Sequence, residues 1–455
     1  MQQPPSAALG GTATGIAPSP EQLAVRKVSR HLLGFLFLLF VFSFLDRINI
    51  GFAGLTMMKD LGLSGTQFGL ATTLFYVAYI ACGIPSNMVL ARIGARRWIA
   101  CMMVAWGVAS TATMFATSPQ SLYVLRILVG VTEAGFLPGM LLYLTYWFPA
   151  SSRARANALF MIAMPVTAAL GSALSGYILG LDGTFGLKGW QWLFLLEGLP
   201  SAVLGLVVFR YLDDTPATAR WLDDNEKRAL ASALAAEHRA DPVAGEAGGK
   251  SLLSELTSAT VVKFAIAYFC LVNTLAMVAV WMPLIVKSIS GAGAGNRTIG
   301  LLATIPQLCT IAAMIWWGRR SDRKQERRWH LMLPMLASAA GWLCTAWSAS
   351  PVLQMAGICL ASAGSYTAMS IFWTTPDHAL SLRARAIGIA VINAAGNIGS
   401  ALNPLAVGWL RDVTHSFTAG LIYAAALLVA GTLLVGILPI ARPAAPAAPA
   451  AQDKQ

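Results

Sequence analysis

The chain has little charge. Of its 455 residues only 11% are Asp, Glu, Lys or Arg, whereas soluble proteins carry about 25%. Hydrophobic residues make up 56%. This balance excludes an ordinary soluble protein and indicates a membrane protein with many spans. At about 20 apolar residues per spanning helix, the length suits about a dozen helices.

The sequence also lacks the patterns of most enzyme and metal sites. Its cysteines form no C-x-x-C pair and have no histidine cluster beside them, so neither a disulfide framework nor a metal site is predicted. A phosphate-binding loop and a nucleophile elbow are missing as well. We therefore expect no cofactor, no metal and no enzymatic activity. An ion gradient is then the available energy source.

The apolar runs predict an all-α membrane protein of twelve transmembrane helices. Two six-helix halves are expected over residues 31–212 and 259–440. Between them, residues 213–258 form a polar cytosolic linker whose pattern predicts an amphipathic helix. Residues 1–30 and 441–455 are expected to be disordered cytosolic tails.

The basic residues predict the orientation of these helices. With both termini in the cytoplasm, most of the 32 Lys and Arg residues fall in cytosolic segments, as expected for loops that stay inside. The outer loops receive only Lys59, Lys188, Lys287, Arg297 and Arg411. The net charge of +12 is thereby explained by topology, and nucleic acid is not expected as a partner.

The two halves repeat each other in sequence. The string RARA at residues 153–156 recurs at residues 383–386. A second set of basic residues recurs at nearly the same offset: Arg92, Arg96 and Arg97 match Arg323, Arg327 and Arg328. Such matches indicate a duplicated six-helix unit in parallel orientation. Two parallel halves around a site near the middle of the membrane are typical of transporters that work by rocking.

Four charged residues lie inside predicted helices. Asp46 and Arg47 interrupt the apolar string FLFLLFVFSFLDRIN over residues 35–49. Arg126 and Glu133 are seven residues apart, which is two helical turns, so they share one face. Because charges are costly against lipid, all four are expected to face the protein interior. Adjacent residues point about 100° apart, so Asp46 and Arg47 cannot both face one partner.

These four residues suggest a proton-coupling mechanism. Without substrate, Asp46 and Glu133 can pair with the two arginines. An organic carboxylate that binds the arginines displaces the acids, and a carboxylate without a partner in a low-dielectric site takes up a proton. The alternative is that the four charges only hold two helices together.

Two loop motifs resemble the major facilitator superfamily. They are WGRRSDRKQERR at residues 317–328 and NMVLARIGARR at residues 87–97. Ala91 stands where the superfamily usually has the acid that is present here as Asp322, which weakens one expected gating salt bridge. The resemblance implies the twelve-helix fold of this superfamily. It also implies gating roles for a set of loop residues, namely Arg92, Arg96, Arg97, Asp322, Arg323, Arg327 and Arg328.

Further strings are similar to the anion:cation symporter family. They are DRINIG, RILVGVTEAGFLPG, YWFPASSRARA, GWQWLFLLEGLPS and INAAGNIGSALNP. The resemblance implies uptake of organic anions with protons or sodium. It assigns proton transfer to Asp46 and Glu133, and substrate contacts to Arg47 and Arg126. Tyr79 matches a substrate-lining tyrosine of relatives that transport hexonates.

The second half has no charge at matching positions and offers neutral polar groups. Ser370 and Trp373 share one face of a predicted helix, and Asn393 and Asn397 share a face of the next. They are candidates for the remaining substrate contacts, although amides can also serve to join helices. Glu197 is a further acid inside a predicted helix, for which a structural role is favoured over a proton role.

The function predicted from the sequence is import of an organic carboxylate by proton symport with alternating access. The string ARWLDDNEKRALASALAAE resembles the branch that handles tartrate, phthalate or hydroxyphenylacetate. Phe44 and Met164 replace polar groups of hexonate transporters, which favours a tartrate-like or aromatic acid. Hexonate symport, anion exchange, facilitated diffusion and, remotely, an anion receptor remain alternatives. The expected state is a monomer in the plasma membrane (the inner membrane of a bacterium).

Overall fold

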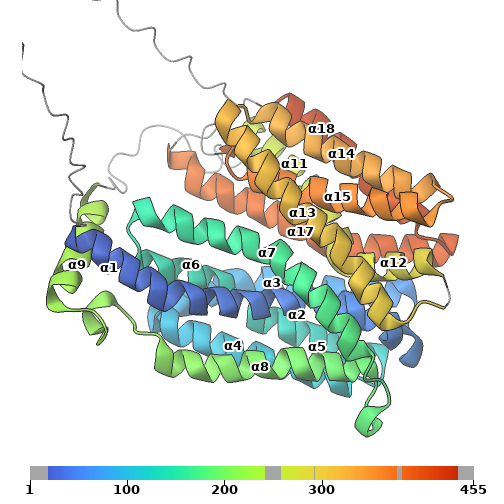
Figure 1. Cartoon of the computed structure of the whole chain (residues 1–455), viewed down its shortest axis with the longest axis horizontal. Helices are drawn as coiled ribbons and strands as arrows, with labels where there is room; N and C mark the ends of the chain where they lie inside the picture. Colours follow the sequence, from blue (N-terminus) through green and yellow to red (C-terminus); the bar gives the residue numbers. More distant parts are fainter. Residues whose placement is uncertain (1–18, 241–257, 292, 377–381, 439–455) are drawn as a thin grey trace, which may run out of the picture.

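A computed structural model describes residues 19–240, 258–291, 293–376 and 382–438, and this part of the chain is helical without strands (Figure 1). The first half contains α1 Pro20–Val28, α2 Gly34–Asp60, α3 Gly65–Ile93, α4 Ala95–Ala112, α5 Pro119–Glu133, α6 Phe136–Trp147, α7 Ala150–Leu179 and α8 Gly189–Tyr211. After α9 Asp224–Ala240, the second half contains α11 Ala259–Ala276, α12 Met282–Ser290, α13 Asn296–Lys324, α14 Arg328–Trp347, α15 Pro351–Phe372, α17 Leu382–Thr414 and α18 Thr418–Gly436.

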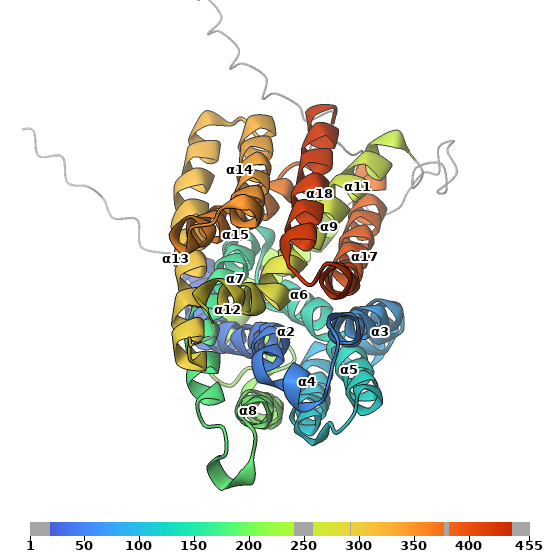
Figure 2. The same cartoon turned by 90° about the vertical axis from the view of Figure 1, so that its right-hand side faces the viewer.

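Several of these helices join end to end into longer rods. One turn of π-helix, Ser29–Leu33, connects α1 to α2, and another, Met277–Trp281, connects α11 to α12. With α5 and α6 also counted as one rod, the described helices give twelve rods, six in each half. Within the described residues, nine rods are long and apolar enough to cross a membrane. The predicted all-α membrane fold is thus confirmed, and Figure 2 shows the halves one above the other.

The first helix begins earlier than expected. Ser19 accepts a hydrogen bond from the backbone N–H of Gln22 at 3.2 Å, and Pro20 occupies the first helical position. Ala24 and Val28 are fully buried, and Lys27 forms an ion pair with Glu226 of the linker helix α9 at 2.8 Å. The disordered tail predicted over residues 1–30 is therefore wrong for residues 20–30, because a capped, docked helix forms there.

The predicted helix that carries Arg126 and Glu133 ends at the second of these residues. α5 ends at Glu133, and α6 begins at Phe136 after a short turn. A methyl group added at Gly135 in this turn would lie 1.9 Å from the hydroxyl of Ser86 and 2.2 Å from the indole nitrogen of Trp98. The glycine lets the turn approach α3 and α4, and Glu133 is thereby placed at a helix end.

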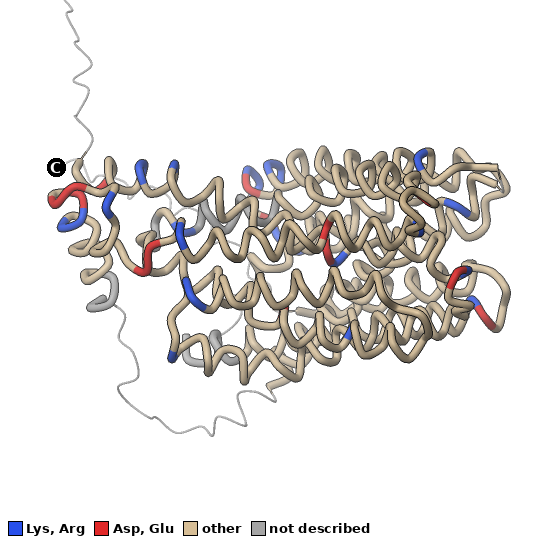
Figure 3. Tube along the Cα trace, turned by 90° about the horizontal axis from the view of Figure 1, so that it is seen from below, with Lys and Arg blue, Asp and Glu red and all other residues tan. Residues whose placement is uncertain are grey.

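Basic residues gather at one end of the bundle, where α1, α9 and the loop between α13 and α14 lie (Figure 3). We call this the linker end and the opposite end the far end. The predicted assignment of the linker end to the cytoplasm stays a prediction.

The described contacts that join the two halves gather toward the far end. α3 and α17 approach so closely that a methyl group at Gly69 would lie 2.1 Å from the carbonyl oxygen of Pro404. On the same pair of helices, Thr73 donates a hydrogen bond to the carbonyl of Ala401 at 2.6 Å. Lys287 of α12 donates to the carbonyl of Leu55 in α2 at 2.9 Å. The halves are therefore in close contact at this end.

Asp412, near the end of α17, caps the first turn of α3 across the two halves. Its carboxylate accepts hydrogen bonds from the backbone N–H groups of Gly65 and Thr66, both at 2.7 Å, and from the Thr66 hydroxyl at 2.6 Å. An anion at a helix N-terminus is also favoured by the helix dipole. Burial opposes ionisation, but the hydrogen bonds outweigh it and hold the pKa of Asp412 below its usual value.

We expect Asp412→Ala to loosen the far end, because three hydrogen bonds between the halves disappear. Loss of such a cap costs about 1–2 kcal/mol. A cysteine introduced at Thr72, which is 3% exposed, should react several-fold faster with a thiol reagent in this background. Mass spectrometry of the labelled peptide measures the rate.

Asp182→Ala is the matched control, because Asp182 accepts from the backbone N–H of Gly189 at 2.8 Å within one half. An equal gain in labelling in both variants would contradict the proposed contact between halves. The pH dependence has a defined sign. Since the folded-state pKa is lowered, the stabilisation is fully present above the ordinary aspartate value of about 3.9 and is lost as pH falls through the lower folded-state value.

Candidate substrate and proton site

Arg47 and Glu133 form an ion pair in which the acid is buried and the arginine is partly exposed. Arg47 lies in the middle of α2, and its Nε donates to Oε1 of Glu133 at the end of α5. Glu133 is 1% exposed, and the Ser43 hydroxyl lies 3.5 Å from the same oxygen. The guanidinium of Arg47 also lies over the ring of Tyr79, 5.0 Å from its centroid. Three residues predicted for the site, Arg47, Glu133 and Tyr79, are thus brought together.

Asp46 points to a different set of partners. Its Oδ1 accepts from the hydroxyl of Ser110 in α4 and from the side-chain amide of Asn49 at 2.9 Å. Asp46 is 3% exposed. The expected divergence of the two adjacent side chains is therefore observed. Asp46 is held by neutral donors, whereas Arg47 is held by an acid.

Arg126 is a buried cation without a carboxylate at ion-pair distance in the described part of the chain. Its guanidinium donates to the hydroxyl of Thr113 at 3.0 Å and lies 5.2 Å from the centroid of the Phe194 ring. The side chain is 3% exposed. The sequence predicted that both acids pair with both arginines. Only Glu133 and Arg47 form an ion pair, whereas Oδ1 of Asp46 accepts hydrogen bonds from Ser110 and Asn49.

A small cavity lies beside these charges. It is lined by the two arginines and by Asp46, together with residues of α2 and α3. The further lining residues are Ile50, Thr72, Phe75 and Tyr76. The cavity therefore has charged groups on one side and aromatic rings on the other, but at about 10 Å³ it has room for no more than a water molecule in this conformation.

Glu197 of α8 is buried, and no cation among the described residues lies at ion-pair distance from it. It is 1% exposed, and its Oε1 accepts from the Ser175 hydroxyl at 2.9 Å. Its Oε2 has no hydrogen-bond partner among the described residues. A charged carboxylate that is buried with only one hydroxyl donor is costly. The contacts of Glu197 therefore favour its neutral form.

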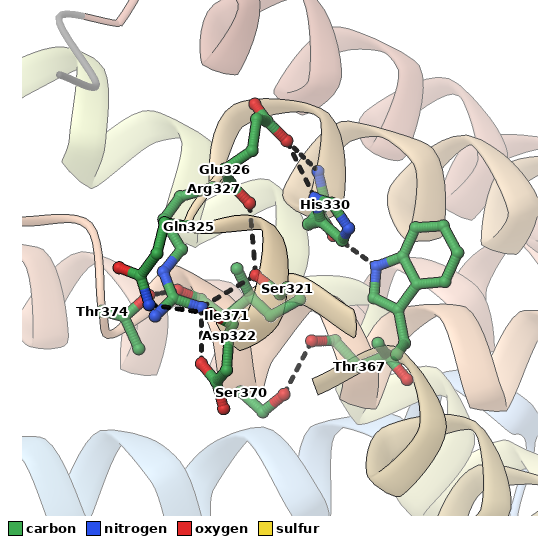
Figure 4. Close-up of polar contacts among 11 residues, drawn as sticks. Ser321, Asp322, Gln325, Glu326, Arg327, His330, Thr367, Ser370, Ile371 and Thr374 are labelled. Carbon is green, nitrogen blue, oxygen red and sulfur yellow. Dashed lines mark hydrogen bonds and ion pairs between the residues drawn. The ribbon is translucent and has the colours of Figure 1, made fainter. Parts of the chain in front are cut away.

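The predicted residues of the second half lie apart from this cavity. The Ser370 hydroxyl donates to the carbonyl of Thr367 at 2.8 Å within its own helix (Figure 4), and the Trp373 indole donates to the Tyr268 hydroxyl at 3.1 Å. Asn393 is exposed and Asn397 is partly exposed. None of the four lines the cavity that holds Arg126.

The sequence missed two residues of the second half that lie close to α2. Gln307 and Tyr366 line a second small cavity together with Ile48 and Phe52. Gln307 is 2% exposed, and its side-chain oxygen has no hydrogen-bond partner among the described residues. A glutamine within an apolar helix could have identified Gln307 as a candidate from the sequence. Ser110 and Thr113 were also missed, because a hydroxyl in an apolar run is common.

The predicted gating residues form separate contacts at the linker end. Arg327 donates to Asp322 at 2.9 Å and to the Ser321 hydroxyl at 2.8 Å (Figure 4). Arg96 contacts Asp214 at 3.1 Å and the carbonyl of Phe209 at 2.6 Å, and Arg328 donates to the carbonyl of Leu438 at 2.7 Å. Arg92, Arg97 and Arg323 are exposed.

Glu326 in the same loop caps α14. It accepts from the backbone N–H of Trp329 at 2.8 Å and contacts the ring of His330 at 2.8 Å. Burial opposes ionisation, but these hydrogen bonds outweigh it and lower the pKa of Glu326. The loop is thus fixed by its own charged residues.

Comparison with known proteins fits a multi-pass membrane transporter. A family model described as Major Facilitator Superfamily matches residues 36–295 and 264–455. An Agrobacterium vitis protein named "Putative tartrate transporter" is 39% identical over 425 residues, 93% of each chain. The inner membrane transport protein RhmT of Escherichia coli is 34% identical over 421 residues, 92% of this chain and 96% of its own.

The structure of the xylose transporter XylE from E. coli has the same fold. It superposes with a TM-score of 0.71 at 12% sequence identity, over 93% of this chain and all of the other. The chain belongs to the major facilitator superfamily. The resemblance drawn from its motifs is confirmed, and the protein is a transporter rather than an enzyme.

The two arginines should respond differently to replacement by methionine. Arg47→Met leaves Glu133 buried without its cation, and breaking a buried pair costs about 3–5 kcal/mol. Arg126→Met removes a buried charge that has no carboxylate at ion-pair distance in the described part of the chain, so the thermal stability of this variant should be unchanged or higher. Thermal unfolding of the purified protein measures both.

The double variant Arg47→Met/Glu133→Gln is the control, because it removes both charges of the pair. It should recover most of the stability that Arg47→Met loses. Equal losses of stability for Arg47→Met and Arg126→Met would contradict the different surroundings of the two arginines.

Proposed function

We propose that the protein imports a small organic carboxylate together with protons, by alternating access of the two halves. The observation that carries this proposal is Arg126, whose buried guanidinium lies beside a cavity and has no carboxylate at ion-pair distance among the described residues. A buried cation of this kind is stabilised when an anion binds next to it. The planar guanidinium suits a carboxylate because it donates two parallel hydrogen bonds.

Proton coupling follows from competition for Arg47. A carboxylate bound between Arg126 and Arg47 weakens the ion pair that Arg47 makes with Glu133. Glu133 then has only the weak Ser43 contact in a buried position and takes up a proton. Asp46 lines the same cavity and serves as the second proton site. Proton release on the other side restores the pair and expels the anion.

Alternating access uses the contacts at the far end. Thr73, Lys287 and Asp412 join the halves there, so this end is closed in the conformation described. We propose that the linker end faces the cytoplasm, which agrees with its basic residues (Figure 3). The contacts of Asp412 must then break each time the site opens outward.

The proposed substrate is tartrate-like or an aromatic acid. A relative covering 93% of the chain is named for tartrate. Phe44 is 8% exposed in the core beside the site, and Met164 packs against the same core. Neither offers a hydrogen bond to a hydroxyl-rich sugar acid. Tyr76 and Phe75 supply aromatic surface at the cavity.

Coupling is tested by uptake into proteoliposomes under an imposed pH gradient. Tartrate should accumulate in wild-type vesicles, and an uncoupler should abolish the accumulation. Asp46→Asn and Glu133→Gln should each abolish gradient-driven accumulation and spare counterflow, since binding and exchange need no net proton transfer.

Two results would contradict proton symport. Accumulation by both variants would show that these acids do not carry the protons. Wild-type counterflow without any response to the gradient would instead indicate an anion exchanger or a facilitative carrier on the same fold.

Substrate class is tested by thermal shift with a panel of carboxylates. A substrate stabilises the protein by mass action, so the melting temperature should rise with tartrate or with a monocyclic aromatic acid. Arg126→Lys should weaken that ligand at least about tenfold, because the paired donors are lost while the charge stays. Arg228→Lys on the exposed surface of α9 is the matched control. A shift with hexonates alone would overturn the proposed substrate class.

A further inference from the structure

One side of α13 is exposed and apolar over most of its length. Leu301, Ile305, Leu308 and Ile315 are exposed at helical spacing. The other sides of the helix are covered. Gly300 packs against Gly176 of α7, where an added methyl group would lie 2.7 Å from the glycine Cα, and Thr310 contacts Ser362 of α15 at 2.9 Å. In a membrane protein this exposed apolar side faces lipid.

At the linker end the same side of α13 becomes basic. A surface hollow of about 560 Å³ is lined there by residues spaced three or four apart. They are Ala312, Ile315, Trp316, Arg319, Arg320, Arg323 and Lys324. The hollow therefore has an apolar part toward the middle of the bundle and four cations at its outer part.

The two acids of the adjoining loop, which the structure describes, do not neutralise the charge of this hollow. Asp322 forms its ion pair with Arg327 at 2.9 Å, and Glu326 contacts His330 (Figure 4). Arg320 instead lies over two indole rings, 5.9 Å from the centroid of Trp316 and 5.5 Å from that of Trp317. Trp316 is 61% exposed. Tryptophan and arginine at the end of a lipid-facing apolar side are typical of the headgroup level.

We propose that this hollow binds the headgroup of an anionic phospholipid, with the acyl chains along the exposed side of α13. The guanidinium groups match the phosphate oxygens, and clusters of four or more basic residues at the end of a membrane helix bind anionic headgroups. The adjoining apolar part distinguishes a lipid from a free anion, because Ile315 and Ala312 offer contact only to hydrocarbon. The site lies on the outside of the bundle and is separate from the Arg126 cavity.

The test is native mass spectrometry of the full-length protein titrated with phosphatidylglycerol or with phosphatidylcholine of the same chains. Wild type should bind phosphatidylglycerol at least about tenfold more tightly. The variant Arg319→Gln/Arg320→Gln/Arg323→Gln should lose about fivefold in affinity per arginine removed.

The matched control is Arg210→Gln/Arg220→Gln/Arg228→Gln, which removes three exposed arginines elsewhere at the linker end. It should bind phosphatidylglycerol as wild type does. Equal losses in both variants, equal binding of the two lipids, or displacement of phosphatidylglycerol by millimolar inorganic phosphate would each overturn the proposal. An unchanged thermal shift with a substrate carboxylate shows that the variants are folded.

Discussion

The structure depends on how charge is held in an apolar interior. An isolated ion in the low-dielectric interior costs several kcal/mol, so each buried charge requires a partner or a neutral form. Arg47 and Glu133 satisfy this requirement for each other, and they join α2 to the end of α5. The break between α5 and α6 directly follows Glu133. The end of α5 and the position of Glu133 are therefore linked to this ion pair.

The same constraint separates the two arginines. Arg47 has an acid, whereas Arg126 has a hydroxyl and an aromatic ring, both of which stabilise a cation less than a carboxylate does. The Arg126 guanidinium can therefore still bind an anion, and it lines a cavity. Arg126 costs the protein stability because it is buried without an acid at ion-pair distance among the described residues, whereas Arg47 has Glu133. Such a cost is typical of a residue that binds a ligand.

Much of the fold could be predicted from composition and periodicity, because a bilayer restricts spanning segments to long apolar helices. The shared interior side of Arg126 and Glu133 followed from helical spacing, and the divergence of Asp46 from Arg47 followed from the 100° step. The early start of α1 could have been found from Ser19 and Gln22, which form a capping box, and from Pro20 at the first helical position.

Which residues the buried polar side chains contact could not be predicted in the same way. Whether Asp46 meets an arginine or Ser110 depends on how α4 is rotated against α2, and sequence spacing within one helix says nothing about that rotation. The position of Gln307 next to α2 depends on how the two halves meet. These contacts are set by packing between distant helices, so they appear only in three dimensions.

Helix α3 connects the candidate site to the far end. It runs unbroken from Gly65 to Ile93, with Asp412 at its N-terminus and Tyr76 about ten residues further, which is about 15 Å along the axis. Tyr79 follows one turn later under Arg47. A helix moves as one body over such a distance. An anion that draws Arg47 away from Glu133 also changes the contact of Arg47 with Tyr79. The proposed binding event therefore acts on α3, whose N-terminus Asp412 holds against the other half. In this proposal α3 alone connects the candidate site to the contacts of Asp412 at the far end.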